Sequence, residues 1–368
     1  MANTRLTRFF EQLPASNMDA IALNAGPTLS YLTGLQFHLS ERPSVLIVAA
    51  DGKAALLIPE LEYGKAAGLG DRIRVYTYGE NPADWADTFR AAGQDLRLQN
   101  PMIGVEPTRF RFLELNLLQT ALPGARFFGA DTFLSSVRMS KDADEIAVMR
   151  EAVRIAQVAF QNTLPAFKIG ATELDLASEL SLQLLRAGSS AEFPFNPIIA
   201  GGPNSANPHA VPSARKFQPG DLVVVDWGAA YQGYISDITR MVAFGPLEPE
   251  LERIVQITTA ANRAGCAAAR PGVTAGSVDA ATRAVIEQAG YGQYFIHRTG
   301  HGIGMESHEP PYIFSGSEFE LGEGMAFTVE PGIYLPGRGG ARIEDNVIIT
   351  AAGAEVLTDL SREIYFAE

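Results

Sequence analysis

The sequence predicts two domains, an α/β domain over residues 1–135 and a larger α+β domain over residues 136–368. Three observations support this prediction. A chain of 368 residues is long enough to form two hydrophobic cores. In the first third, short apolar runs alternate with amphipathic stretches, whereas the remainder has longer amphipathic stretches and strands bounded by glycines. The pattern changes within residues 135–141, where we place the boundary.

Composition and charge exclude several classes of protein. Hydrophobic residues make up 46% and charged residues 19% of the chain, a mix typical of a soluble globular protein. The net charge of 29 − 42 = −13 disfavours nucleic acid or an anionic membrane as a partner, because both repel an acidic surface. The single cysteine, Cys266, rules out an intrachain disulfide and multi-thiolate metal sites. Residues 1–14 do not resemble a signal peptide, and no apolar run reaches the roughly 18 residues of a membrane helix, so we expect a cytoplasmic protein.

The first domain is expected to be an α/β layer. Apolar runs predict strands at 20–23, 44–49, 54–58, 74–78 and 102–105, and amphipathic stretches predict helices at 60–67, 82–92 and 109–122. The glycines here lack the spacing of a phosphate-binding loop. His38 could contact a substrate or a second subunit, but we interpret it as a surface histidine of a loop.

A long helix opens the second domain. Asp142 and Glu145 have the spacing of a capping box, and apolar residues then recur at helical spacing. Further helices are expected at 172–186, 249–269 and 277–289, and strands at 197–201, 221–229, 233–244, 325–330, 332–335 and 340–350. Helices packed on a largely antiparallel, curved sheet give an α+β arrangement.

A pair of aspartates follows the first strongly apolar strand of this domain. If the chain turns near Tyr231 and Gln232, Asp226 and Asp237 lie opposite one another, with Cβ atoms about 4.5–5.5 Å apart. Two carboxylates this close between apolar strands repel each other unless a proton or a cation lies between them. The pair predicts a metal site, and the alternative is two solvated acids on an edge strand.

A second pair of acids and one histidine strengthen the metal interpretation. Glu330 and Glu344 are equidistant from Gly337, so a hairpin centred there sets them opposite each other. His301 is bracketed by glycines, which let the backbone approach a ligand closely. Four carboxylates and one imidazole suit Mn²⁺ and can also hold Co²⁺, Zn²⁺ or Fe²⁺. Two such ions would offset the negative charge of the buried acids.

These residues and their surroundings resemble the pita-bread family of dinuclear metallopeptidases, which includes methionine aminopeptidase, aminopeptidase P and prolidase. The matching blocks are DWGAAYQGYISDITR at 226–240, HRTGHGIG at 297–304, TVEPGIY at 328–334 and GARIED at 340–345. The resemblance covers residues 140–368, and the preceding domain is similar to the creatinase-type N-terminal domain of the branch that cleaves Xaa-Pro bonds. The resemblance thus implies a pita-bread catalytic domain behind a creatinase-like domain.

The resemblance also implies roles for the five residues. Asp226 would bind one metal ion, His301 and Glu330 the other, and Asp237 and Glu344 would bridge the two. A water molecule held between the ions would become a nucleophile at neutral pH. Glu330 would take its proton and later help deliver one to the leaving proline nitrogen. The implied substrates are short peptides with proline in second position, either Xaa-Pro dipeptides or Xaa-Pro-Yaa peptides, and relatives are commonly homodimers.

Further positions match blocks of the same family. His209 and His308 match histidines that line the substrate cleft and donate to the oxyanion or contact the proline. Arg342 is expected to orient Asp237 through an ion pair, and Tyr334 resembles a tyrosine near the site.

Two other observations bear on the substrate and the reaction. Some dipeptide-specific prolidases carry an arginine for the proline carboxylate where this chain has Tyr312, so a clamp from that position is not expected here. Another arginine, from the N-terminal domain or a partner subunit, could replace it. A creatinase-like amidinohydrolase and a non-catalytic peptide-binding module are alternatives on the same fold. Both are disfavoured because this chain retains all five metal ligands.

Overall fold

The structure is a computed structural model that describes residues 2–367, with side chains from Thr4 onward. The chain divides into two compact units, Met1–Arg138 and Met139–Glu368. Across the described residues, no helix is both long enough and apolar enough to span a membrane.

The first unit is built on one six-stranded sheet, in the order β4-β3-β2-β1-β5-β6. Its strands are β1 (Ala20–Asn24), β2 (Val45–Ala49), β3 (Ala54–Pro59), β4 (Ile73–Tyr78), β5 (Met102–Val105) and β6 (Arg126–Gly129). Its helices are α1 (Ala2–Gln12), α2 (Pro27–Thr33), α3 (Tyr63–Ala66), α4 (Trp85–Asp95), α5 (Phe112–Ala121) and α6 (Asp131–Met139), which reaches the first residue of the second unit. The sequence did not predict α1, α2, α6 or β6. The three central strands pair antiparallel and the outer ones parallel, which is a mixed α/β layer.

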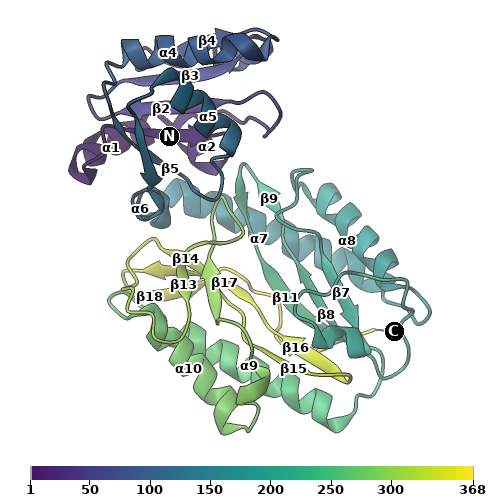
Figure 1. The fold of residues 1–368 in the computed structure, drawn as a ribbon. Coiled ribbons are helices and arrows are strands. Elements are labelled where there is room, and N and C mark those ends of the chain that lie inside the picture. The colour runs from purple at the N-terminus through teal and green to yellow at the C-terminus, as the bar shows by residue number, and fades with distance from the viewer. Residues whose placement is uncertain (1, 368) are drawn as a thin grey trace. The chain divides into compact units, whose positions relative to one another are not determined.

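Four long helices surround the strands of the second unit (Figure 1). They are α7 (Ala143–Thr163), α8 (Glu173–Ala187), α9 (Pro249–Ala268) and α10 (Ala275–Gln288), close to the four ranges predicted. The predicted capping box is present, since the Asp142 side chain accepts from Glu145 N at 3.0 Å and Glu145 accepts from Asp142 N at 2.8 Å. These two hydrogen bonds satisfy backbone donors at the start of α7.

Two larger sheets carry the site residues. One has the order β19-β11-β8-β7 and the other β13-β12-β14-β17-β18, with short two-stranded pairs β9–β10 and β15–β16. The strands are β7 (Ile198–Gly201), β8 (Leu222–Trp227), β9 (Ala230–Tyr231), β10 (Tyr234–Ile235), β11 (Ile238–Ala243), β12 (Gly300–Gly302), β13 (Glu309–Ile313), β14 (Ala326–Val329), β15 (Gly332–Leu335), β16 (Gly339–Arg342), β17 (Asp345–Thr350), β18 (Gly353–Val356) and β19 (Tyr365–Phe366). β9, β12, β13, β18 and β19 were not predicted.

Alternation along β8 decides which way Asp226 points. Val223 and Val225 pack in the core formed with α7 and α8, whereas Leu222 and Val224 pack in the core formed with α9 and the β15–β16 hairpin. Because successive side chains of a strand point to opposite faces, Asp226 shares the face of Leu222 and Val224. A carboxylate is therefore directed into the interior between the sheets.

The first hairpin differs from the predicted register by two residues. Asp226 lies opposite Thr239, so Asp237 is its diagonal neighbour and not its direct partner. The turn is centred on Gln232 and Gly233, whose φ angles of 47° and 83° fit a type I′ hairpin turn. A shift of two residues keeps side chains on the same face, so both aspartates still point to the same side.

The second hairpin has the predicted register. β14 pairs with β17 and β15 with β16 in one continuous register, in which Val329 is opposite Asp345 and Gly332 is opposite Arg342. Glu330 and Glu344 occupy the corresponding positions between the two ladders. The prediction that Glu330 and Glu344 lie opposite one another across the hairpin is confirmed.

Candidate metal centre and substrate cavity

The two hairpins are joined at Thr239. This residue pairs with Asp226 on one side and forms an isolated antiparallel bridge with Glu344 on the other, where Glu344 N donates to Thr239 O at 3.2 Å. The Thr239 hydroxyl also donates to Glu344 Oε2 at 2.7 Å. Backbone pairing therefore places acids from both hairpins around one threonine.

The predicted ligands converge in the structure. Oxygen or nitrogen atoms of Asp237, His301 and Glu344 lie within 4.8 Å of one another, and all three residues are buried. His301 Nε2 is 3.2 Å from Glu330 Oε1 and 3.8 Å from Asp237 Oδ2. His301 lies on β12. Its backbone N–H donates to the Thr328 hydroxyl at 3.2 Å.

Without a cation, the negative charges of these buried carboxylates repel one another. Burial raises the pKa of Asp226, and burial together with the charge of Glu344 raises the pKa of Asp237 well above its ordinary value. Burial and the charge of Glu330 likewise raise the pKa of Glu344 well above normal. Burial opposes ionisation of Glu330 too, but its hydrogen bond with His301 and the charges of His301 and Arg342 together outweigh that effect and lower the pKa to about 2.

This donor set fits divalent metal ions. Asp226 Oδ1 is buried and has no hydrogen-bond partner among the described residues, so one oxygen is left for a ligand. Burial and mutual repulsion raise the pKa values of these acids, and a bound cation would relieve both effects by stabilising the ionised carboxylates. Asp226, Asp237, His301, Glu330 and Glu344 would hold the ions, as the sequence predicts.

Arg342 contacts a different aspartate from the one expected. Its Nη2 donates to Asp226 Oδ2 at 2.5 Å, and its Nε donates to the Thr239 hydroxyl at 3.2 Å. The prediction that Arg342 orients Asp237 through an ion pair is wrong, because its carboxylate partner among the described residues is Asp226. Arg342 Nη1 also donates to the hydroxyl of Tyr334 at 2.8 Å, so Tyr334 supports the arginine that holds Asp226.

His297 continues this chain of hydrogen bonds. Its Nε2 is 2.9 Å from the Tyr334 hydroxyl, and its Nδ1 is 2.7 Å from Arg298 O. Because the Tyr334 oxygen accepts from Arg342, its O–H donates to Nε2, and Nδ1–H donates to the carbonyl. Burial lowers the pKa of His297, in agreement with a neutral ring that shapes the cavity without binding metal.

The acids line the wall of a cavity of about 630 Å³. His209 and His308 line the same cavity, so the structure brings both predicted cleft histidines to the candidate centre. The ring of His308 packs against the ring of His301, with centroids 4.1 Å apart. Burial and the neighbouring His301 lower the pKa of His308 to about 4, so it is neutral near pH 7. The remaining wall is largely apolar and comes mainly from residues 194–198 and 208–212.

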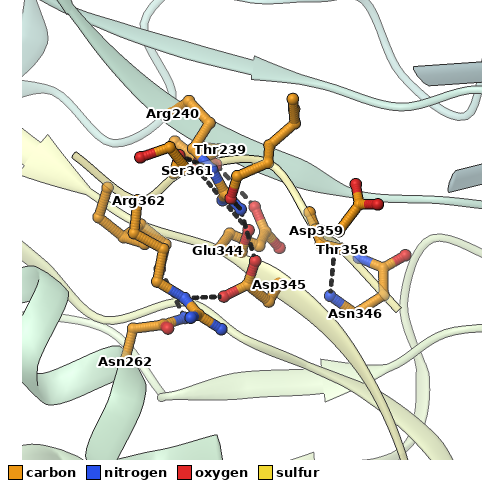
Figure 2. A network of polar contacts seen from close by, with 12 residues as sticks. Thr239, Arg240, Asn262, Glu344, Asp345, Asn346, Thr358, Asp359, Ser361 and Arg362 are labelled. Carbon is orange, nitrogen blue, oxygen red and sulfur yellow. Dashed lines mark hydrogen bonds and ion pairs between the residues drawn. The ribbon is translucent and has the colours of Figure 1, made fainter. Parts of the chain in front are cut away.

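A buried network behind the acids had no predicted role. Arg240 has no exposed surface, and it donates to Thr239 O at 2.9 Å, Glu344 O at 2.7 Å and Asp345 Oδ1 at 2.7 Å (Figure 2). Arg362 donates to the other oxygen of Asp345 at 2.7 Å. Arg240 thus holds together the backbone segments that carry acids of both hairpins. Its place in the DITR block is the one sequence feature that could have pointed to this role.

Comparison with known proteins agrees with this architecture. Residues 147–351 match metallopeptidase family M24, and residues 5–140 match the creatinase/prolidase N-terminal domain. An Xaa-Pro dipeptidase of Lactobacillus delbrueckii subsp. lactis is 35% identical over 356 residues, which is 96% of each chain. The chain is also similar to the structure of a dipeptidase from Pyrococcus horikoshii OT3, with 36% identity, a TM-score of 0.91 and 98% and 99% of the two chains covered. An X-Pro aminopeptidase from Thermotoga maritima MSB8 gives 30% identity, a TM-score of 0.86 and 98% and 99% coverage.

These matches confirm the predicted combination of a creatinase-type domain with a pita-bread domain of α+β structure. The first match spans more than half of the sequence, and the relatives are similar over nearly their whole length. The chain belongs to metallopeptidase family M24.

Proposed function

We propose that this protein hydrolyses the peptide bond between an N-terminal residue and a following proline. The convergence of four carboxylates and His301 on one wall of the cavity carries this proposal, because such a site suits metal-assisted hydrolysis. The Xaa-Pro dipeptidases among the relatives support the choice of substrate.

Two divalent cations, with Mn²⁺ as our choice, would polarise the scissile carbonyl and lower the pKa of a water molecule when bound. Glu330 borders the cavity and hydrogen-bonds to His301, and we assign it the transfer of a proton from water to the leaving proline nitrogen. Its pKa of about 2 keeps it ionised at neutral pH, as a proton acceptor must be. His308 is neutral near pH 7 and retains one N–H to donate to the carbonyl oxygen as negative charge develops there. His209 faces the same space and is assigned the same kind of contact.

Arg298 supplies a reason to favour dipeptides. It lines the cavity, and its guanidinium lies 4.4 Å from the ring centroid of Tyr312. Within the described residues it has no carboxylate partner. A cation without an acid partner beside the metal ligands suits the free carboxylate of a dipeptide. The sequence left open which arginine replaces the one absent at Tyr312, and we assign that contact to Arg298 of the HRTGHG block.

Kinetics with the Mn²⁺-loaded protein test this preference. We expect Arg298→Met to raise KM for an Xaa-Pro dipeptide by about tenfold or more, because a charge-assisted contact is lost. KM for the corresponding Xaa-Pro-Yaa tripeptide should change far less. The matched control is Arg263→Met, which removes an exposed arginine paired with Glu363. Equal effects of Arg298→Met on both substrates would contradict the carboxylate contact and favour an aminopeptidase.

We also propose a cytoplasmic homodimer, supported by the family resemblance and the single cysteine. Gel filtration that returns a monomer would contradict the assembly. Cell fractionation would contradict the location if the protein were recovered outside the cytoplasm.

A further inference from the structure

The position of His209 depends on the backbone of its loop. His209 is exposed, and its imidazole makes no hydrogen bond with the described part of the chain. Its backbone N–H donates to Asn207 Oδ1 at 3.1 Å. The loop of residues 202–212 begins at the end of β7 with the 3-10 helix Gly202–Ala206 and continues as irregular chain. Something outside the loop must therefore fix the ring in the cavity.

Glu173, in the first turn of α8, binds both ends of this loop. Its Oε1 accepts from Gly201 N at 2.8 Å and from Asn204 Nδ2 at 3.0 Å. Its Oε2 accepts from Ser213 N at 3.0 Å and from Ser213 Oγ at 2.6 Å. The glutamate is completely buried. One carboxylate thus joins the residue before the loop, a residue within it and the residue after it.

Other contacts extend this anchoring toward the metal ligands. Leu174 N in α8 donates to Ser213 O at 3.1 Å, so the start of the helix also binds the outgoing chain. Near the tip, Arg342 Nη1 donates to Pro208 O at 3.3 Å. His209 therefore lies between a base fixed by Glu173 and a tip that contacts the arginine bound to Asp226.

We propose that Glu173 is a positioning residue for the reaction, which holds His209 in the cavity through the loop of residues 202–212. This inference rests on the proposed function, in which His209 contacts the substrate. Glutamine cannot replace the carboxylate, because either orientation of its amide places an NH₂ group against donors of Gly201 and Asn204 or against donors of Ser213. The acid is required as an acceptor on both sides.

A double-mutant cycle tests the link between the two residues. We expect Glu173→Gln to lower kcat for an Xaa-Pro dipeptide by about tenfold or more, as when a transition-state donor is misplaced. The number of Mn²⁺ ions bound per chain should stay unchanged. In a His209→Ala background, the same substitution should change kcat by less than about twofold, because coupled residues are not additive. Independent, multiplicative effects or a wild-type kcat in Glu173→Gln would overturn the proposal.

Asp175→Asn is the matched control. Asp175 caps the same helix end by accepting from Thr172, and the described structure gives it no hydrogen bond or ion pair with the loop of residues 202–212. A general weakening of the start of α8 would appear in this variant, whereas loss of the loop anchor would not. If Glu173→Gln does not fold, Ser213→Ala removes the hydroxyl contact and tests the same anchor more gently.

Hydrogen exchange followed by mass spectrometry separates this inference from the proposed function. Glu173→Gln should speed amide exchange in residues 202–213 and leave residues 226–237 unchanged, even if the wild-type protein cleaves no Xaa-Pro peptide. Unchanged exchange in residues 202–213 would overturn the positioning role. Inactive wild-type protein with faster loop exchange in the variant would instead contradict the proposed function alone.

Discussion

Arg342 donates to Asp226 across 2.5 Å, and both residues are buried. The arginine engages one oxygen of the aspartate and leaves the other, Oδ1, without a hydrogen-bond partner in the described part of the chain. A carboxylate fixed in this way has one oxygen for orientation and one for a ligand. The ion pair therefore leaves Asp226 with one oxygen that would be available to a metal ion.

We expect Arg342→Lys to weaken metal binding by about 10- to 100-fold, because lysine cannot contact Asp226, Thr239 and Tyr334 at once. Isothermal titration of the metal-free protein with Mn²⁺ measures the change. Arg338→Lys, in the turn of the same hairpin, is the control, since its ion pairs are exposed and contribute little. Equal affinity in the two variants would show that Asp226 needs no orienting partner.

Metal-free protein should lose stability as the pH rises. Asp237 and Glu344 have pKa values well above normal in the folded protein, so the stability they contribute is present at low pH and is lost as the pH rises through those values. Glu330 acts in the opposite sense, but its contribution is already complete above about pH 5, because its ordinary pKa is near 4.3.

Melting temperatures between about pH 7 and pH 8.5 check this expectation, because the lowered pKa values of His308 and His297 act in the opposite sense only up to the ordinary histidine pKa near 6.5. The melting temperature of the metal-free protein should fall across this range, and the gain from added Mn²⁺ should grow, because metal binds the deprotonated acids. A gain independent of pH would contradict the assignment of these acids as ligands.

Glu330→Gln should lower kcat by about 10²–10⁴-fold, because an amide cannot take up and return a proton. Glu330 is also one of the five proposed metal ligands, so the variant should bind metal more weakly through the other four, among them the cluster of Asp237, His301 and Glu344. Steady-state kinetics together with metal analysis distinguish the two effects. Glu318→Gln alters an exposed acid and serves as the control. Retention of kcat by the Glu330 variant would assign the proton transfer to another group.

Sequence patterns predicted the residues of the candidate centre better than the hairpin register and the hydrogen bonds that position them. Glycines around His301 and the symmetry of Glu330 and Glu344 about Gly337 are local features that remain visible in the sequence. The register of the first hairpin depends on a turn whose two central residues both have positive φ, and glycine marks only the second of them. The partner of Arg342 depends on how the two hairpins meet through the bridge between Thr239 and Glu344, which no local sequence feature indicates.

Several strands depend on tertiary contacts. β12 is the segment Gly300–Gly302, and β13 contains Pro310 and Pro311. Both glycine and proline have low strand propensity. β13 lies at the edge of its sheet, where proline is tolerated because fewer ladder hydrogen bonds are required. Glu173 likewise looks like an ordinary acid in the first turn of a helix, and only the folded structure brings it to residues 201, 204 and 213.

The most direct test is to strip the protein of metal, titrate it with Mn²⁺, and follow bound metal and peptide cleavage together, using an Xaa-Pro dipeptide and its Xaa-Ala counterpart. We predict that two ions bind per chain, that cleavage of the Xaa-Pro dipeptide rises with their binding, and that the Xaa-Ala dipeptide is cleaved far more slowly. Stoichiometric metal binding without cleavage of the Xaa-Pro bond would contradict the proposed function, and cleavage by metal-free protein would contradict the metal centre.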